Sequence, residues 1–159
     1  MSAILFTGFP GFLGSELLPR LLARSPGDYA LCIVQPKFAA LARHRAASLE
    51  AARPELAGRI RLIEGDITRP LDVPAGELRE IWHLAAVYDL AVSRELGMRV
   101  NVEGTRNVLE LARRSPSLER LHYVSTCYVS GRYEGVFAEA DLEKGQRFNN
   151  HYEETKYLA

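Results

Sequence analysis

The chain has 159 residues, of which 47% are hydrophobic and 25% are charged, and its 20 basic and 20 acidic side chains cancel. This length predicts one domain with a core, while the charge balance and the lack of a long apolar run argue against a nucleic-acid partner, an anionic membrane surface and a membrane span. Because the first residues lack the features of a signal peptide, and because Cys32 and Cys127 have no metal-ligand spacing, we expect a cytoplasmic protein with no metal site.

Apolar strand patterns alternate with helical patterns along the chain, which is typical of parallel β-α-β units. The patterns predict strands over 3–7, 29–34, 60–64, 80–84 and 121–125, helices over 13–24, 38–53 and 93–114, and a further helix from about residue 150. Pro19 lies inside the first helical stripe and is expected to kink that helix or raise its energy. The predicted fold is a doubly wound parallel α/β sheet that stops after its fifth strand.

The first strand runs directly into the glycine turn Thr7-Gly8-Phe9-Pro10-Gly11-Phe12-Leu13-Gly14. The first glycine permits a sharp turn, the second lets backbone approach a pyrophosphate, and the third lets the next helix pack close to the sheet. The amino end of that helix also offers free N–H groups to an anion. Three glycines occur in plain turns too, but strand, turn and helix are all present here. We therefore expect cofactor contacts from Gly8, Phe9, Gly11, Phe12, Leu13 and Gly14.

The turn resembles that of the extended short-chain dehydrogenase/reductases, which have a three-layer Rossmann fold. The Phe12-Leu13 variant is most similar to the branch that contains fatty acyl-CoA reductases and the terminal thioester-reductase domains of carboxylic acid reductases. The resemblance covers essentially the whole chain and implies hydride transfer between NADPH and a carbonyl, with an acyl thioester or an aldehyde as the substrate class. Extended members are about twice as long, so it also implies one NAD(P)-binding domain over residues 1–159 without its substrate domain, and little or no activity of this chain alone.

The end of the second strand bears on the choice between NAD(H) and NADP(H). An NAD-specific site places a carboxylate there to hold the ribose 2′-hydroxyl, whereas this strand runs into Gln35-Pro36-Lys37. Lys37, followed by Arg43 and Arg45, offers the cations that a 2′-phosphate requires, so NADP(H) is favoured over NAD(H). The alternative is that these cations form a solvated basic helix face, and Arg43 lies nearly two turns into the helix.

The resemblance implies further cofactor contacts beyond the third and fourth strands. Asp66 would meet the adenine amino group and Ile67 would pack on the ring, although Asp66 also suits a turn cap. The small-residue segment Leu84-Ala85-Ala86 would let backbone pass close to the cofactor.

The predicted central helix carries a second segment that matches the family. The resemblance counts Asn101 among the residues of the cofactor site, most often with a structural role in which it bridges this helix to the active-site backbone. Gly104 inside a helix costs about 1 kcal/mol relative to alanine, so close packing is the expected reason for it. His83, at the end of the fourth strand, is expected to be a packed strand residue rather than a catalyst.

The pair Tyr152 and Lys156 carries the catalytic prediction, because a spacing of four places both side chains on one helical face. A free tyrosine ionises well above neutral pH, and a neighbouring ammonium favours the phenolate. Tyr152 can then exchange a proton with a substrate oxygen, while Lys156 would also hold the nicotinamide ribose. The pattern Tyr-x-x-x-Lys is common on helix surfaces, and its position after the fifth strand makes it specific here.

The end of the fifth strand supplies the third catalytic candidate. A hydroxyl group there can hydrogen-bond a developing oxyanion and orient a substrate carbonyl. The resemblance places a Ser or Thr at this strand end, and the register favours Thr126 over Ser125.

Two other classes of function share these features. Epimerases, dehydratases and reductases that act on nucleotide sugars carry the same motifs. A nucleotide-binding fragment or regulator without catalysis is the other alternative, although such proteins tend to lose the Tyr or the Lys that this chain keeps. An exposed sheet edge beyond the fifth strand would also invite association, so a homodimer is one expected form.

Overall fold

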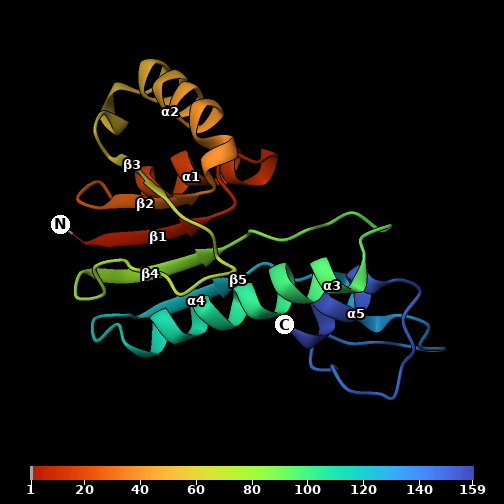
Figure 1. Ribbon diagram of the computed structural model, residues 1–159. Helices are drawn as coiled ribbons and strands as arrows, with labels where there is room; N and C mark the ends of the chain where they lie inside the picture. The colour runs from red at the N-terminus through yellow and green to blue at the C-terminus, as the bar shows by residue number, and fades with distance from the viewer. Residues whose placement is uncertain (1) are drawn as a thin grey trace.

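A five-stranded parallel sheet forms the centre of the structure, a computed structural model that describes residues 2–159 (Figure 1). Its strands are β1 (Ala3–Thr7), β2 (Tyr29–Val34), β3 (Ile60–Glu64), β4 (Leu78–His83) and β5 (Arg120–Tyr123). They lie in the order β3-β2-β1-β4-β5, so the strand order reverses on either side of β1. A parallel sheet with such a reversal opens a crevice at the carboxyl ends of its strands.

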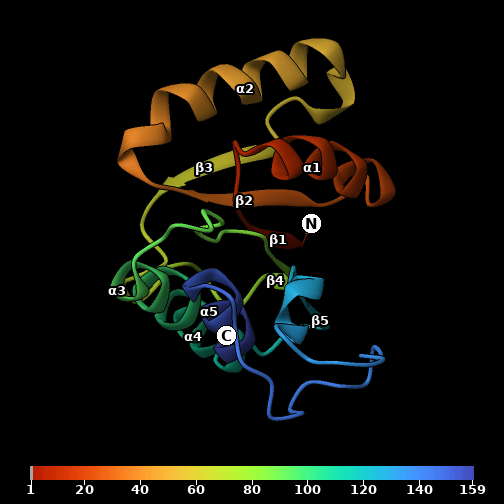
Figure 2. The same cartoon turned by 90° about the vertical axis from the view of Figure 1, so that its right-hand side faces the viewer.

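Helices cover both faces of this sheet and make the predicted three-layer arrangement (Figures 1 and 2). α1 (Phe12–Arg24) and α2 (Ala39–Ala52) lie on one side, and α3 (Arg94–Gly97), α4 (Gly104–Arg113) and α5 (His151–Leu158) lie on the other. Short 3₁₀ turns lie in the connections between strands and helices: η1 (Pro36–Phe38), η2 (Pro54–Leu56) and η4 (Cys127–Ser130). α1 continues through the buried Pro19 without a break. None of the helices formed by residues 2–159 has the length and apolar composition that crossing a bilayer demands.

Alternate residues of the central strands enter two separate cores. Leu5 of β1 and Leu31 of β2 pack with Val108 and Leu111 of α4 on one face, whereas Phe6 packs on the other face beside α1. Because both faces are covered, every residue of β1 and β2 is buried, as expected for strands of a parallel α/β sheet. Full burial of a side chain such as Phe6 contributes about 1.5–3 kcal/mol.

The predicted central helix is present but not uniform. Residues Arg94–Gly97 form α3, Met98–Glu103 form the wider π-helical segment η3, and Gly104–Arg113 form α4. A Cβ on Gly104 would lie 2.8 Å from Cδ1 of Ile67, which confirms the close packing predicted for this glycine. Single π turns occur often at functional sites, and this one carries Asn101.

Two strand boundaries differ from the prediction in a way that matters for the site. β4 begins at Leu78 and ends at His83, and β5 already ends at Tyr123. Ser125 therefore lies beyond the end of β5 rather than within the strand, and Thr126 follows it. The reason is that β5 follows β4, whose last residue, His83, pairs with Tyr123.

Candidate active site

The glycine turn joins β1 to α1 at the point where the strand order reverses. Gly8 has a φ of 94°, and a Cβ there would lie 2.9 Å from Cβ of Leu84. A Cβ on Gly11 or Gly14 would lie 2.8 Å or 2.6 Å from the carbonyl oxygen of Gly8. The turn therefore packs closely against itself and against the end of β4. A side chain at any of these three positions would clash with neighbouring atoms.

The amino end of α1 is left open by this turn. Gly11 is the N-cap and provides no side-chain cap, so the first N–H groups of the helix have no capping side chain. Phe12 and Leu13 are 82% and 59% exposed, whereas Phe9 is buried at 4%. A cradle of glycine backbone ending in uncapped N–H groups fits the pyrophosphate of a dinucleotide cofactor, and Phe9 could contact it only through backbone.

A buried chain of hydrogen bonds fixes the turn to the neighbouring strand. Thr7 Oγ1 accepts hydrogen bonds from the backbone N–H groups of Leu84 (3.2 Å) and Ala85 (3.1 Å), so its own proton goes to Nδ1 of His83, 2.7 Å away. Nε2 of His83 must then carry the ring proton, which it donates to Oγ1 of Thr105 at 3.0 Å. Thr105 in turn donates to the carbonyl of Asn101.

This network explains why His83 is a structural residue, as predicted. The ring is 1% exposed, and burial, followed by the positive charge of Lys156, lowers its pKa to about 4. It is therefore neutral at physiological pH and can keep one nitrogen as donor and the other as acceptor.

The ends of β2 and β3 are tied together where the adenosine part of a cofactor is expected. Nε2 of Gln35 donates to Oδ2 of Asp66 at 2.9 Å, and the N–H of Thr68 donates to Oδ1 at 2.9 Å. Partial burial would raise the pKa of Asp66, but the hydrogen bonds from Thr68 and Gln35 outweigh it and keep the pKa below its usual value. Asp66 thus caps a turn, and Gln35 stands where an NAD-binding site would place its acid.

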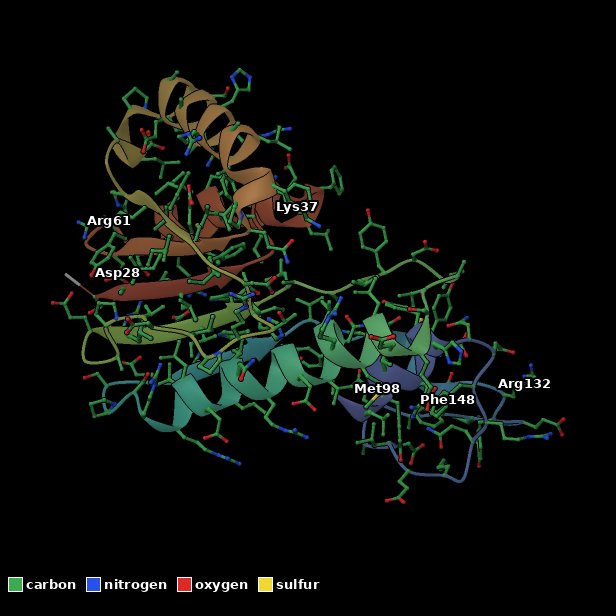
Figure 3. All side chains as sticks on the ribbon, in the orientation of Figure 1. Asp28, Lys37, Arg61, Met98, Arg132 and Phe148 are labelled. Atoms are coloured by element: carbon green, nitrogen blue, oxygen red, sulfur yellow. The ribbon has the colours of Figure 1, made fainter. Side chains whose placement is uncertain are left out.

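The basic residues after β2 lie at the carboxyl-end side of the sheet, where Figure 3 shows Lys37. Lys37 is exposed in η1, with its Nζ 4.9 Å from the centre of the Phe38 ring. Arg43 is further along α2 and lies 3.8 Å from a carboxylate oxygen of Glu64, with both side chains more than half exposed. Lys37 is the freer of the two predicted cations to meet a phosphate.

Two predicted cofactor residues lie in the interior. Ile67 is 6% exposed and packs against α4 at Gly104, so its side chain belongs to the core. Asn101 is 1% exposed and binds both backbone groups of Val87, which lies in the segment after β4; its Nδ2 also donates to Oγ1 of Thr155, 3.0 Å away. Asn101 therefore bridges the central helix to the segment after β4 and to α5.

Helix α5 brings Tyr152 and Lys156 to the carboxyl end of β5. Asn150 caps this helix by accepting a hydrogen bond from the N–H of Glu153, and a salt bridge of 2.8 Å joins Glu154 to Arg94 of α3. On the buried side, Thr155 fits against Gly97, where a Cβ would lie 3.1 Å from its Cγ2. The position of the helix is thus determined by its cap, by an ion pair and by close packing.

Lys156 is the most constrained of the predicted catalytic residues. It is 4% exposed, and its Nζ donates to the hydroxyl of Tyr123 at 2.6 Å and to the carbonyl of Val124 at 2.7 Å. Burial lowers the pKa of Lys156 to about 8, so the ammonium form still predominates at neutral pH. An ammonium has three donor protons, and these two bonds leave one for a ligand.

The other predicted catalytic residues lie on α5 and on the segment that follows β5. Tyr152 is half-buried one turn before Lys156 on α5. Thr126 caps η4, with its Oγ1 accepting a hydrogen bond from the N–H of Tyr128, and α5 packs against η4. Ser125 is exposed beside it. The predicted catalytic residues therefore lie on α5 and at the start of η4, and these two elements are in contact.

Sequence reasoning missed Tyr123 as the partner of Lys156. The two residues are 33 positions apart, and an aromatic residue in a strand normally indicates packing. The register between β4 and β5 pairs His83 with Tyr123 and places the Tyr123 hydroxyl within hydrogen-bonding distance of Lys156. No motif in the sequence carries that register.

Comparison with known proteins gives a family match over nearly the whole chain. A family model of NAD-binding proteins, described as Male sterility protein, matches residues 6–159.

Curated relatives match over most or all of this chain but only part of their own length. A 3-beta-hydroxysteroid dehydrogenase of Mycolicibacterium neoaurum is 29% identical over 170 residues, which are 100% of this chain and 42% of that protein. Fatty acyl-CoA reductase 1 of Xenopus laevis is 29% identical over 145 residues, which are 80% of this chain and 28% of that protein. The chain thus spans less than half the length of these relatives.

Solved structures agree with this picture. The terminal R domain from the myxalamid PKS-NRPS biosynthetic pathway has a TM-score of 0.75 at 29% identity, covering 99% of this chain and 43% of that one. DesIV, a dTDP-glucose 4,6-dehydratase from Streptomyces venezuelae with NAD and TYD bound, has a TM-score of 0.77 at 26% identity, covering 98% and 48%.

Proposed function

The chain belongs to the NAD-binding family described as Male sterility protein, and from that premise we propose that it is the NADP(H)-binding part of an oxidoreductase that reduces the carbonyl of an acyl thioester or aldehyde. The observation that carries the proposal is the buried ammonium of Lys156, which lies one helical turn from Tyr152 at the carboxyl end of β5. A site of this kind combines a proton donor with a fixed positive charge.

The proposed mechanism assigns one task to each group. The cofactor, when bound, supplies the hydride that adds to the carbonyl carbon. Tyr152 donates its phenolic proton to the carbonyl oxygen, and the hydroxyl of Thr126, or of Ser125, hydrogen-bonds that oxygen as its charge develops. Lys156 holds the ribose next to the nicotinamide and favours the phenolate that Tyr152 becomes.

The remaining predicted residues form the proposed cofactor site. The backbone of the glycine turn, with Phe12 and Leu13 at the start of α1, holds the pyrophosphate. Asp66 lies at the adenine end, and the backbone of Leu84-Ala85-Ala86 passes beside the cofactor. Ile67 and Asn101 support these segments from within the core.

We propose NADP(H) rather than NAD(H), supported by Gln35 in the place of an acid and by the exposed ammonium of Lys37. Lys37→Ala is expected to weaken NADPH binding about fivefold to tenfold, because a charge-assisted contact to the 2′-phosphate is lost at an exposed site. NADH binding should not change. Fluorescence titration of both cofactors measures the two affinities.

The matched control for this test is Arg106→Ala, which removes one positive charge from the exposed side of α4. It should leave both affinities as they are. An equal loss for NADPH and NADH in Lys37→Ala, or no loss for either, would contradict the proposed phosphate contact.

The substrate class is proposed from the fatty acyl-CoA reductase relative and the R-domain structure. NADPH consumption would be followed with a fatty acyl-CoA, the matching aldehyde and a nucleotide sugar. We expect the 159-residue chain to bind NADPH and to consume it slowly at most, with the acyl-CoA or the aldehyde. Tyr152→Phe should reduce any such rate by about 10²- to 10⁴-fold, the usual contribution of general acid catalysis.

Rapid turnover by the 159-residue chain would refute the proposal that it is only the cofactor-binding domain. A second candidate is a nucleotide-sugar enzyme, which the similarity to the DesIV structure favours. Consumption that depends on a nucleotide sugar and not on an acyl-CoA or aldehyde would support that candidate instead.

A further inference from the structure

The hydroxyl of Tyr123 occupies a position that none of the predicted catalytic roles uses. Tyr123 is the last residue of β5, and its hydroxyl accepts a hydrogen bond of 2.6 Å from Nζ of Lys156. The carbonyl of Val124 accepts a second bond of 2.7 Å from the same atom. Two acceptors on consecutive residues thus hold the ammonium from the strand side.

The ring of Tyr123 is itself held in place. It stacks on the ring of His83, with 5.5 Å between the ring centres and 27° between the planes. Both ring nitrogens of His83 form hydrogen bonds, one with Thr7 on β1 and the other with Thr105 on α4. The ring on which Tyr123 stacks is therefore itself fixed at both of its nitrogens.

The electrostatics of the pair suit this role. Burial is the main cause that raises the pKa of Tyr123 to about 12, and the nearby phenol of Tyr152 raises it further. Tyr123 is therefore a neutral acceptor for the ammonium and not a competing phenolate. The Nζ of Lys156 also lies 4.1 Å from the centre of the Tyr123 ring, so the π-face adds attraction.

We propose that Tyr123 is a positioning residue, which fixes the ammonium of Lys156 so that its third proton points to the cofactor ribose. This inference rests on the proposed role of Lys156 in holding that ribose. It predicts that affinity for the nicotinamide half of the cofactor depends on a hydroxyl that does not itself touch the cofactor.

Tyr123→Phe tests the proposal because it keeps the stacked ring and removes only the hydroxyl. We expect NADPH to bind about fivefold to tenfold more weakly, since the ammonium loses one charge-assisted contact and its fixed direction. Adenosine 2′,5′-bisphosphate, which lacks the nicotinamide ribose, should bind as well as to the unchanged chain. Competition with NADPH fluorescence measures both affinities.

A second readout follows Lys156 directly and needs no cofactor. The chain has three lysines, Lys37, Lys144 and Lys156, so their side-chain NMR signals can be assigned from single substitutions. Without the phenol as acceptor, the pKa of Lys156 should fall below its value of about 8, while the titration curves of the other two stay in place. Tyr128→Phe, which removes an exposed hydroxyl from neighbouring η4, is the matched control and should change neither readout.

The outcomes separate this inference from the proposed function. If Lys156→Met weakens NADPH binding but Tyr123→Phe changes neither NADPH affinity nor the Lys156 titration, Tyr123 does not position the lysine. Equal weakening of NADPH and adenosine 2′,5′-bisphosphate in Tyr123→Phe would also overturn the proposal, because it indicates a general loss of structure. If the unchanged chain binds no NADPH, the proposed function fails, and the Lys156 titration still decides the role of Tyr123.

Discussion

Gly14→Ala is expected to weaken NADPH binding by at least tenfold and to lower the free energy of unfolding by about 1–2 kcal/mol. The added Cβ would lie 2.6 Å from the carbonyl oxygen of Gly8, 3.0 Å from its carbonyl carbon and 3.2 Å from Cε1 of Phe6. Overpacking of this kind costs about 1–3 kcal/mol, and the higher helix propensity of alanine returns at most about 1 kcal/mol.

We expect NADPH binding to be affected as well as stability, because the clash is with backbone of the turn itself. Gly8 has little room to shift, since even a Cβ on it would lie 2.9 Å from Cβ of Leu84 and 3.1 Å from the backbone N of Ala85, so we expect the cradle to open. Urea unfolding and NADPH fluorescence measure the two effects. Gly27→Ala is the control, because a Cβ there has no neighbour within 4 Å, and it should change stability by no more than about 0.5 kcal/mol. Normal NADPH affinity in Gly14→Ala would show that the turn does not hold the cofactor.

The free energy of unfolding is expected to fall by about 2 kcal/mol between pH 6.5 and pH 5, and by about 3 kcal/mol by pH 4, because of His83. Burial first, and the charge of Lys156 second, lower its pKa from 6.5 to about 4. Within this window the unfolded chain binds a proton at His83 and the folded chain does not. The contribution of His83 to the free energy of unfolding is therefore present above pH 6.5 and is lost as the pH falls. Each pKa unit corresponds to about 1.4 kcal/mol.

The other groups whose pKa values the fold shifts titrate largely outside this window. Lys156 is charged in both states below pH 7, and the carboxylates of Asp66, Glu80, Asp141 and Glu154 have pKa values below their usual ones, so the stability they contribute is lost mainly below this window. Urea midpoints between pH 7 and pH 5 therefore report mainly on His83. His83→Asn should flatten the pH dependence, whereas His44→Gln, which removes an exposed imidazole from α2, should leave it unchanged. A stability that is constant from pH 6.5 to pH 5 in the unchanged chain would contradict the buried neutral state of His83.

Local sequence patterns were sufficient for the elements and for part of the site. The apolar runs of β1 and β2 predicted the observed bounds, because buried parallel strands need continuous apolar residues. The bounds of β3 were also predicted, although this edge strand exposes Arg61 and Glu64. The glycine turn could be predicted because its geometry excludes side chains at three positions, Gly8, Gly11 and Gly14, which lie within seven consecutive residues. The spacing of Tyr152 and Lys156 predicted their common helical face for the same local reason.

Contacts between distant segments could not be predicted in this way. The end of β5 at Tyr123, the π-helical segment around Asn101 and the buried side chain of Ile67 all depend on how neighbouring elements pack. The hydrogen bond from Thr7 to His83 spans 76 residues. Propensity and spacing carry no information about such pairs, because their partners meet only when the sheet has formed.

The amino-acid sequence alone therefore determined the order of strands and helices, the glycine turn and the Tyr-Lys pair, since each depends on interactions within one or two turns of chain. Only the tertiary structure decided which groups surround the lysine and which tautomer His83 adopts. The register between β1, β4 and β5 sets these features, because it places Thr7, His83 and Tyr123 side by side at the ends of three adjacent strands.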